Sequence, residues 1–348
     1  MIRAMDEDFE LDLPTLDELN KNYSLRCAIR EYIKKSGELK RYLDRHPEQW
    51  NKFQDEINEI VDSVSREMAR FEEEHIREEQ KIYKLKRFFI QRLRKYFLYG
   101  HYITWSLEKP YGYAGDFQII DDIYLNDPQS KGFERLWDNY FLRMGPSIAT
   151  RNRKEDFKSI IKRLTAQRAS PVARIMDLAS GPCRELKELM AENGFGGRNV
   201  VFDCYDFDDH AIAYAKELLN NPPTIYFYKK NALRLSLKKD IKSEIPNEYD
   251  LIFSTGLFDY LDERVATRLV GNLRKLLKED GWLCISNYRG KSANPWAHLM
   301  EWVAEWNLIY RTEDEFVKLF TDAGFAKKNL TIEFEPLRIM QYCLAQNG

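Results

Sequence analysis

The chain has 348 residues, of which 44% are hydrophobic, and its 54 basic and 56 acidic residues leave a formal net charge of −2. This length suffices for one large domain or two ordinary ones, and the balanced charge gives no overall field that would gather nucleic acid. Five scattered cysteines without a Cys-x-x-Cys pair favour reduced thiols over disulfides or a zinc site. No basic-then-apolar leader and no run of about 18 apolar residues is visible, so we expect a cytoplasmic protein without a membrane span.

The first half of the chain is expected to be helical. Residues 1–14 are acidic and irregular, and Thr15 with Glu18 three positions on predicts a capping box at a helix start. Apolar residues then recur every three or four positions from Phe53 to Phe71 and from Ile82 to Phe97, which predicts two amphipathic helices. We interpret the glutamate-rich and lysine-rich runs around them as solvated helix faces, with an RNA-binding helix as the alternative.

A glycine-containing loop follows these helices. Residues 111–117 read Tyr-Gly-Tyr-Ala-Gly-Asp-Phe, and the two glycines predict an ordered loop with positive backbone angles. Tyrosines and an aspartate just ahead of a catalytic domain favour a lid near 110–117 over a plain connector. Helices are expected again from Phe133 to Leu142 and, after an Arg-Asn-Arg stretch at 151–153, around Phe157 to Leu164.

From residue 171 onward, short apolar strands alternate with helices, which predicts a parallel sheet covered by helices. The expected strands are Ile175–Asp177, Val200–Asp206, Ile225–Tyr228, Tyr249–Gly256 and Trp282–Ser286, with an antiparallel pair at the sheet edge, Leu330–Glu335 and Gln341–Ala345. Asp280-Gly281 predicts a turn before the fifth strand. The expected fold is therefore α/β and Rossmann-like, with an α-helical region at 1–150 and a second domain at 151–348.

The turn after the first strand is built from small residues, Ala179-Ser180-Gly181-Pro182-Cys183. Such a turn lets a ligand lie against the backbone. It lacks the Gly-x-Gly-x-x-Gly pattern that brings a pyrophosphate to a helix N-terminus, because only Gly181 is present. Asp206 ends the second strand, where an acid hydrogen-bonds both hydroxyls of an adenosine ribose.

In order and spacing, these segments resemble the class I S-adenosylmethionine (SAM) methyltransferases. Asp177 to Cys183 resembles their glycine loop, with Ala179 at the usual place of the first glycine and Cys183 where a third often stands. Lys230-Asn231-Ala232-Leu233 resembles the element whose polar side chain reads the adenine amino group. The resemblance implies a seven-stranded methyltransferase sheet and SAM as cofactor, with no metal. The implied cofactor site comprises Asp116, Arg153, Asp177, Ala179, Ser180, Gly181, Asp206, Phe207, Asn231, Ala232 and Ser254. Arg153 or Arg151 would face the methionine carboxylate, although pairing with surface acids is the alternative for both.

A second resemblance concerns the acceptor. The Tyr-Gly-Tyr-Ala-Gly-Asp loop, the Arg-Asn-Arg stretch and Asp-Leu-Ala-Ser-Gly-Pro-Cys-Arg-Glu together resemble bacterial methyltransferases of the 3-hydroxypalmitate methyl ester synthase type. They also resemble enzymes that methylate the C-terminal carboxylate of ribosomally made peptides. Both kinds esterify a carboxylate, so the resemblance implies a small-molecule or peptide carboxylate acceptor.

A carboxylate is already a nucleophile at pH 7, so its methylation needs placement and desolvation rather than a base. The positioning groups should be neutral or cationic donors, and the candidates are Tyr113, Tyr288, Arg289 and His298. The alternatives are hydroxyl or phenol methylation with Asp259 or His298 as base, a SAM-binding protein without turnover, and RNA methylation. The tryptophan-rich segment 296–306 either packs in the core or lines an acyl or peptide pocket. The sequence does not decide between a monomer and a homodimer.

Overall fold

The computed structural model describes residues 22–168, 172–192 and 194–348. They fall into two compact units. The helical unit comprises the described residues of 22–115, 126–147 and 295–307, and the sheet unit comprises those of 116–125, 148–294 and 308–348. This division differs from the predicted boundary at 150/151 in three segments, because 116–125 and 148–150 belong to the sheet unit and 295–307 belongs to the helical unit.

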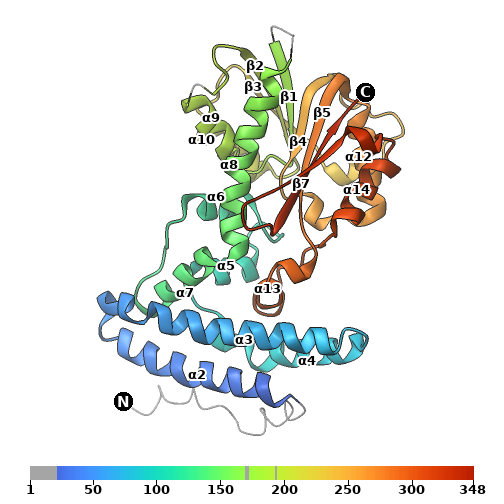
Figure 1. The fold of residues 1–348 in the computed structure, drawn as a ribbon. Coiled ribbons are helices and arrows are strands. Elements are labelled where there is room, and N and C mark those ends of the chain that lie inside the picture. Colours follow the sequence, from blue (N-terminus) through green and yellow to red (C-terminus); the bar gives the residue numbers. More distant parts are fainter. Residues whose placement is uncertain (1–21, 169–171, 193) are drawn as a thin grey trace. The chain divides into compact units, whose positions relative to one another are not determined.

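The helical unit contains both of the long amphipathic helices expected from the sequence. Its elements are α2 (Tyr23–Leu43), η1 (Pro47–Phe53), α3 (Gln54–Glu74), α4 (Glu79–Arg92), η2 (Arg94–Phe97), α5 (His101–Glu108), α7 (Gly132–Arg143) and α13 (Ala297–Ala304) (Figure 1). The second helix is shorter than predicted, because α4 ends at Arg92 and the chain continues as the 3-10 turn η2. The capping box predicted at Thr15 lies outside the described residues.

The tryptophan-rich segment contributes to the core of this unit. Trp302 on α13 is fully buried. Its ring centroid lies 6.2 Å from that of Phe71 and 5.7 Å from that of Phe89. Its indole N–H donates to Oε1 of Glu72 over 2.6 Å. Packing therefore accounts for Trp302.

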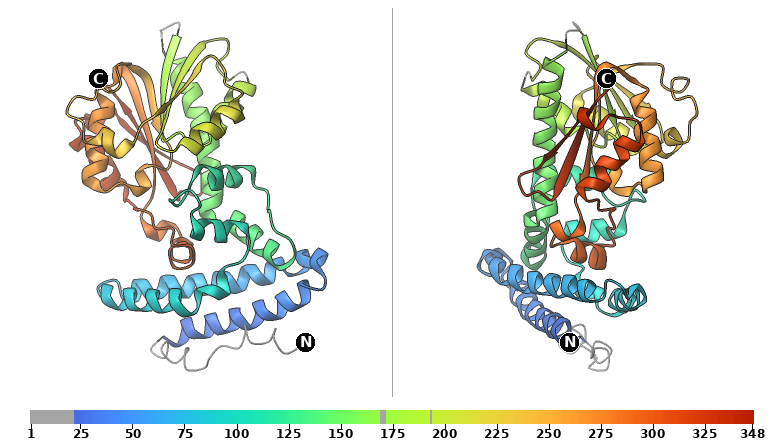
Figure 2. Two further views of the ribbon diagram at one scale, coloured as in Figure 1. Left: turned by 180° about the vertical axis from the view of Figure 1, so that it is seen from behind. Right: turned by 45° about the vertical axis from the view of Figure 1, so that its right-hand side comes forward.

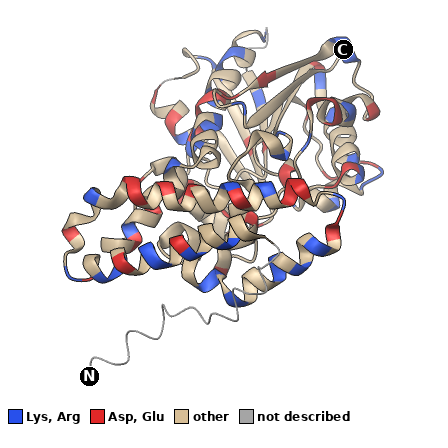
Figure 3. Ribbon diagram, turned by 60° about the horizontal axis from the view of Figure 1, so that its bottom comes forward, with Lys and Arg blue, Asp and Glu red and all other residues tan. Residues whose placement is uncertain are grey.

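The charged runs pair with each other in the helical unit. Lys86 Nζ lies 2.7 Å from Glu72 Oε1 and 2.8 Å from Glu301 Oε2. Figure 3 shows acidic and basic positions interspersed along the long helices. This pattern is typical of a salt-bridged, solvated face.

The sheet unit is built on seven strands in the order β3-β2-β1-β4-β5-β7-β6. Their bounds are β1 (Val172–Leu178), β2 (Asn199–Asp206), β3 (Ile225–Lys229), β4 (Tyr249–Ser254), β5 (Leu277–Tyr288), β6 (Leu330–Phe334) and β7 (Met340–Gln346). The first five pair in parallel, whereas β7 pairs antiparallel with both β5 and β6. The predicted strands and the antiparallel pair at the edge are confirmed.

The predicted turn at Asp280-Gly281 is instead an irregularity inside β5. Tyr249 is in register with Leu277, but Leu251 is in register with Trp282. The β5 strand therefore has extra residues at this point, and Asp280 among them adopts a left-handed conformation with a φ of +56°. A Cβ at Gly281 would lie 2.9 Å from the carbonyl oxygen of Tyr249, so a larger residue would force the backbone apart.

Helices cover both faces of the sheet (Figures 1 and 2). The helices α8 (Gly145–Ala166), α9 (Arg184–Ala191) and α10 (Asp209–Leu219) lie on one face, and α12 (Glu263–Arg274) and α14 (Glu313–Asp322) lie on the other. The short helix α11 (Ala232–Ser236) is tied to α12, because the side-chain amide of Asn272 donates to the Leu235 carbonyl oxygen over 2.9 Å. Residues 151–153 are already helical, since α8 begins at Gly145. Among the described helices, none is both long enough and apolar enough to cross a membrane.

Candidate functional site

The loop between β1 and α9 adopts the conformation that glycine favours at three positions, although only one is glycine. Ala179, Gly181 and Cys183 have φ angles of +58°, +52° and +53°. The N–H groups of Ala179 and Ser180 donate to the carbonyl oxygen of Tyr205 over 2.7 Å and 3.2 Å, which ties the loop to β2. A Cβ built on Gly181 would meet nothing within 4 Å. The loop therefore has room for a ligand beside its glycine.

Asp206, at the end of β2, faces this loop. Its Oδ2 accepts a hydrogen bond from the Gly181 N–H over 2.9 Å, and its Oδ1 accepts one from the Asp208 N–H over 3.0 Å. Burial raises the pKa of this carboxyl group above its ordinary value. Beside it, Phe207 leaves 47% of its surface exposed. The loop, the acid and an apolar side chain thus adjoin at the end of β2.

Asn231 follows β3 and caps α11. Its side-chain oxygen accepts a hydrogen bond from the Arg234 N–H over 3.1 Å. An amide oxygen has a second lone pair, and the amide nitrogen still has two hydrogens to donate. Asn231 can therefore offer both a donor and an acceptor to a ligand edge, next to the buried Ala232.

Asp177 and Ser254 are buried at the carboxyl ends of β1 and β4. The Ser254 hydroxyl donates to the Leu178 carbonyl oxygen over 2.7 Å, so it links the two strands. Asp177 Oδ2 has no hydrogen-bond partner within the described part of the chain. Asp177, Cys183 and Cys204 hold their ligand atoms within 4.8 Å of one another, a spacing that could accommodate a metal ion.

Arg153 on α8 is 4% exposed. Its Nη2 donates to the Tyr124 hydroxyl over 3.5 Å, and its Nε has no partner among the described residues. A Cβ on Gly256 would lie 3.2 Å from Arg153 Nη1, so the backbone after β4 runs alongside the guanidinium. Tyr288 and Asp259 lie close enough to act on its charge. A buried cation thus lies among hydroxyl groups near the ends of β4 and β5.

Asp259 and Tyr288 are held in place at the end of β5. Asp259 Oδ1 accepts a hydrogen bond from the Tyr288 N–H over 2.8 Å and another from the Asn287 side-chain amide over 2.5 Å. Burial raises the pKa of Asp259 to about 6. The Tyr288 hydroxyl shares a hydrogen bond with the Thr150 side chain, and burial raises its pKa. Tyr288 is therefore a neutral side chain at pH 7.

The other predicted site residues have different surroundings. Arg289 Nη1 donates to the Arg338 carbonyl oxygen over 2.9 Å, and its guanidinium lies 5.0 Å from the Phe334 ring centroid. Tyr113 and His298 belong to the helical unit, where His298 Nδ1 lies 3.1 Å from Glu72 Oε2. Asp116 Oδ1 accepts from the N–H groups of Gln118 and Ile119, both over 3.0 Å, and so begins the next helix. The predicted positive φ angles are confirmed at Gly112 and Gly115.

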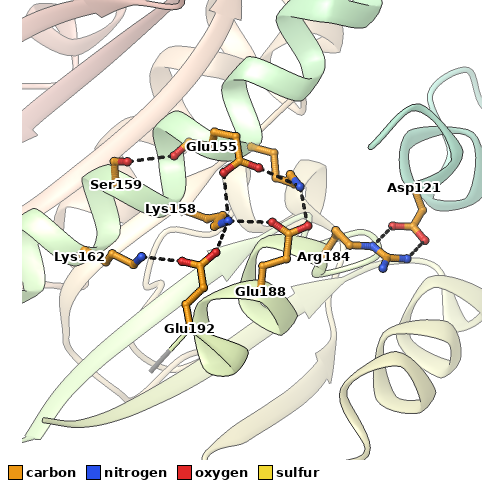
Figure 4. A network of polar contacts seen from close by, with 9 residues as sticks. Asp121, Glu155, Lys158, Ser159, Lys162, Arg184, Glu188 and Glu192 are labelled. Carbon is orange, nitrogen blue, oxygen red and sulfur yellow. Dashed lines mark hydrogen bonds and ion pairs between the residues drawn. The ribbon is translucent and has the colours of Figure 1, made fainter. Parts of the chain in front are cut away.

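That helix, α6 (Phe117–Leu125), was not foreseen and brings Tyr124 to Arg153. It is fixed by the fully buried Asp121, which binds Arg184 through both carboxylate oxygens (Figure 4) and accepts from the Tyr214 hydroxyl. Apolar residues at 117, 120 and 124 have helical spacing, a signal that could have revealed α6.

Glu185, in the first turn of α9, was also missed. It is 5% exposed, and burial raises its pKa to about 7. The rest of α9 is joined to α8 by ion pairs: Lys158 Nζ lies 2.8 Å from Glu188 and 2.7 Å from Glu192 (Figure 4). These contacts fix the helix that follows the loop relative to the helix that carries Arg153.

Residues 176–283 match the family model described as a methyltransferase domain. The chain is 26% identical over 165 residues to the ubiquinone/menaquinone biosynthesis C-methyltransferase UbiE of Rickettsia felis, covering 47% of this chain and 52% of that protein. The same enzyme of Rickettsia bellii is 24% identical over equal shares. The chain thus spans about half the length of the curated relatives it matches.

Among solved structures, that of a possible exported protein from Bordetella parapertussis has a TM-score of 0.53 and 21% identity, covering 66% of this chain and 79% of the other. The matched segment identifies a SAM-dependent methyltransferase domain. The residues present fit this cofactor, since the loop is open at Gly181 and Arg153 Nε is an unused buried donor.

Proposed function

We propose that this chain is an O-methyltransferase that forms a methyl ester on a carboxylate, either of a small acid of the hydroxy fatty acid type or of a peptide C-terminus. The observation that carries the proposal is the setting of Arg153. This buried cation has no ion pair within the described residues, and its neighbours include the hydroxyl groups of Tyr124 and Tyr288. Such a setting favours an anionic reactant.

We assign the cofactor roles to residues of the loop and the strand ends. Asp206 accepts from the two ribose hydroxyls, Asn231 reads the adenine edge, and the backbone of Ala179 to Gly181 lines the ligand. When bound, SAM supplies a methyl group activated by its sulfonium. Asp116 and Ser254 support this site indirectly, because their side chains cap α6 and link β4 to β1.

The acceptor needs little acid–base help from the protein. A carboxylic acid is ionised at pH 7, so no proton has to be removed before the oxygen attacks. What this chain must supply is desolvation and in-line placement about 3 Å from the methyl group. Tyr288 suits this task, because a neutral hydroxyl orients a carboxylate without repelling it. Tyr113, Arg289 and His298 remain candidates for holding the remainder of the acceptor.

Hydroxyl or phenol methylation is the second candidate and requires a base. Asp259 has a suitable pKa of about 6, but its Oδ1 already accepts two hydrogen bonds that hold β5. His298, the other candidate base, lies 3.1 Å from Glu72 within the helical unit. A third candidate is a protein that binds SAM without turnover.

An acceptor panel tests the reaction class. Purified protein with SAM is offered 3-hydroxydecanoate, its primary amide and the matching alcohol, and a peptide with either a free or an amidated C-terminus. We expect S-adenosylhomocysteine (SAH) release with the free acid or the free peptide carboxylate. Turnover of the amide or alcohol at an equal rate would contradict the proposal.

An Asp259→Asn variant separates the two reactions. Asparagine keeps an oxygen that can accept the Tyr288 N–H hydrogen bond but cannot act as a base. Carboxyl methylation should lose less than about 10-fold in kcat/KM, whereas a base-dependent reaction should lose about 100-fold or more.

A further inference from the structure

Three side chains that can bind a metal ion converge near the end of β1. Asp177 lies in the last part of β1, Cys183 directly precedes α9, and Cys204 lies in β2. A carboxylate oxygen of Asp177 and the two sulfur atoms lie within 4.8 Å of one another, and no other group of three such ligands occurs in residues 22–168, 172–192 and 194–348. Because the three residues belong to different elements, the fold and not a local motif brings them together.

The group is buried, and one of its atoms lacks a partner. Asp177 is 1% exposed, and both cysteines are fully buried. Asp177 Oδ2 accepts no hydrogen bond from the described part of the chain. A buried polar atom without a partner costs free energy, because it has lost its contact with water. A cation bound to this oxygen would offset that cost.

Neighbouring charges also favour a cation. Glu185, in the first turn of α9, and Asp206, at the end of β2, both lie close enough to Asp177 to act on its charge. Carboxyl groups gathered in a buried region repel one another when they are ionised. A bound cation reverses this effect, since it attracts each of them.

The ligand set favours a divalent ion of the zinc type. Thiolate sulfur selects such ions, whereas Mg²⁺ and Ca²⁺ take oxygen ligands. Bonds of about 2.3 Å from sulfur and about 2.0–2.2 Å from oxygen to a tetrahedral centre place the ligand atoms about 3.5–3.8 Å apart. Small shifts of the side chains would therefore close the site. Two thiolates and a carboxylate carry three negative charges, and a divalent ion compensates more of them than a monovalent ion does.

We propose that Asp177, Cys183 and Cys204 bind a divalent cation of the zinc type on the buried side of the loop between β1 and α9. Each ligand that carries a proton releases it to solvent as its bond to the ion forms. The Cys183 thiol donates to the Ser180 carbonyl oxygen over 3.7 Å, and the bond to the ion replaces this weak hydrogen bond. The ion thereby links β1, α9 and β2 beneath the loop. This site goes beyond the proposed function and does not depend on the methyl acceptor.

Binding is measured on the full chain in the presence of a reductant that contains no thiol. Calorimetric titration with zinc chloride should show one ion per chain, and titration with magnesium chloride should show no binding. Cadmium chloride then identifies the ligands, because cadmium bound to thiolates gives an ultraviolet charge-transfer band that oxygen ligands do not give. A parent protein that binds neither zinc nor cadmium would overturn the proposal.

The variants are Cys204→Ser and Asp177→Asn, and Cys284→Ser is the matched control. Cys284 is equally buried and lies near the buried Cys343, but these two cysteines belong to no group of three ligands among the described residues. Cys204→Ser should weaken zinc binding at least about 10-fold and reduce the cadmium band. Asp177→Asn should weaken zinc binding at least about 10-fold and keep the band, because both thiolates remain. The control should behave like the parent.

Circular dichroism establishes first that each variant is folded. Parental zinc affinity in folded Cys204→Ser and Asp177→Asn would place the ion elsewhere and overturn the site. An equal loss of affinity in Cys284→Ser would contradict it as well, because the effect would then not be specific to the three ligands. If Cys204→Ser does not fold, Cys183→Ser takes its place with the same expected losses. None of these measurements requires turnover, so failure of the methyl ester proposal leaves this test intact.

Discussion

The backbone N–H of Gly181 donates a hydrogen bond to the carboxylate of Asp206 over 2.9 Å. The loop after β1 and the acid at the end of β2 therefore form one connected structure. This arrangement holds the acid against the backbone of the loop, as the proposed ribose contact requires.

We predict that Asp206→Ala weakens SAM binding by about 10-fold or more, because a hydrogen bond to a charged group contributes about 1.5–3 kcal/mol. Calorimetric titration with SAH measures this change. Asp209→Asn is the matched control, since Asp209 is 69% exposed and pairs with the exposed Lys229. A folded Asp206→Ala variant with parental affinity would remove Asp206 from the ribose site.

Ala179→Gly should stabilise the protein. Ala179 has a φ of +58°, a conformation that costs an L-residue about 1–2 kcal/mol, whereas glycine loses about 0.5–1 kcal/mol in additional entropy on folding. The free energy of unfolding in urea should therefore rise by about 0.5 kcal/mol. Ala179→Val, which is β-branched, should lower it, and equal stability of the two variants would show that the loop is not strained.

Asp121→Asn should destabilise the sheet unit by about 3 kcal/mol, because removing one partner of a buried ion pair leaves Arg184 uncompensated. Asp121 is fully buried, and 13% of the Arg184 side chain is exposed. The comparison is Asp322→Asn in the exposed pair with Lys318, where less than about 0.5 kcal/mol is expected. If urea unfolding shows that the two variants lose similar amounts of unfolding free energy, the anchoring role of Asp121 is contradicted.

Glu185 should make stability fall as the pH rises. The unfolded chain loses this proton near the ordinary pKa of 4.5, whereas burial keeps it on the folded chain up to about pH 7. The stabilisation is therefore complete below pH 4.5 and is lost by about pH 7. Glutamine cannot ionise, so the Glu185→Gln variant lacks this pH dependence. The difference in free energy of unfolding, variant minus parent, should therefore rise by about 1–3 kcal/mol between pH 4.5 and pH 7.

Glu192→Gln is the control for this pH dependence. Hydrogen bonds from Lys158 and Lys162 lower the pKa of Glu192 to about 2. Its contribution is complete above pH 4.5, so the difference between Glu192→Gln and the parent should stay constant from pH 5 to 7.5. A slope in this control equal to that of Glu185→Gln would refute the assignment to Glu185.

The sheet could be predicted from the sequence because its signals are local. Short apolar runs that end in Asp177 and Asp206 mark buried strands with polar tips, and the chain order then fixes a parallel sheet. The prediction of a turn at Asp280-Gly281 was wrong, because an Asp-Gly pair is typical both of a turn and of a bulge inside a strand. The left-handed conformations of Ala179 and Cys183 have no local signal either, since the surrounding fold imposes them on non-glycine residues.

The candidate site could be predicted in part. Asp206 and Asn231 follow strands and were visible as motifs. Tyr124 and Arg153 are 29 residues apart on different helices, and only the docking of α6 through Asp121 brings them together. Long-range side-chain pairing of this kind has no periodicity that a single sequence can show.

The central claim is that the product is a methyl ester. The purified protein is incubated with methyl-tritiated SAM and fractionated bacterial extract, and the products are then treated with mild alkali. We predict that the label is released as volatile methanol, because esters hydrolyse under these conditions. Label that stays on the product after alkali would mean an ether, amine or carbon–methyl bond and would contradict the account.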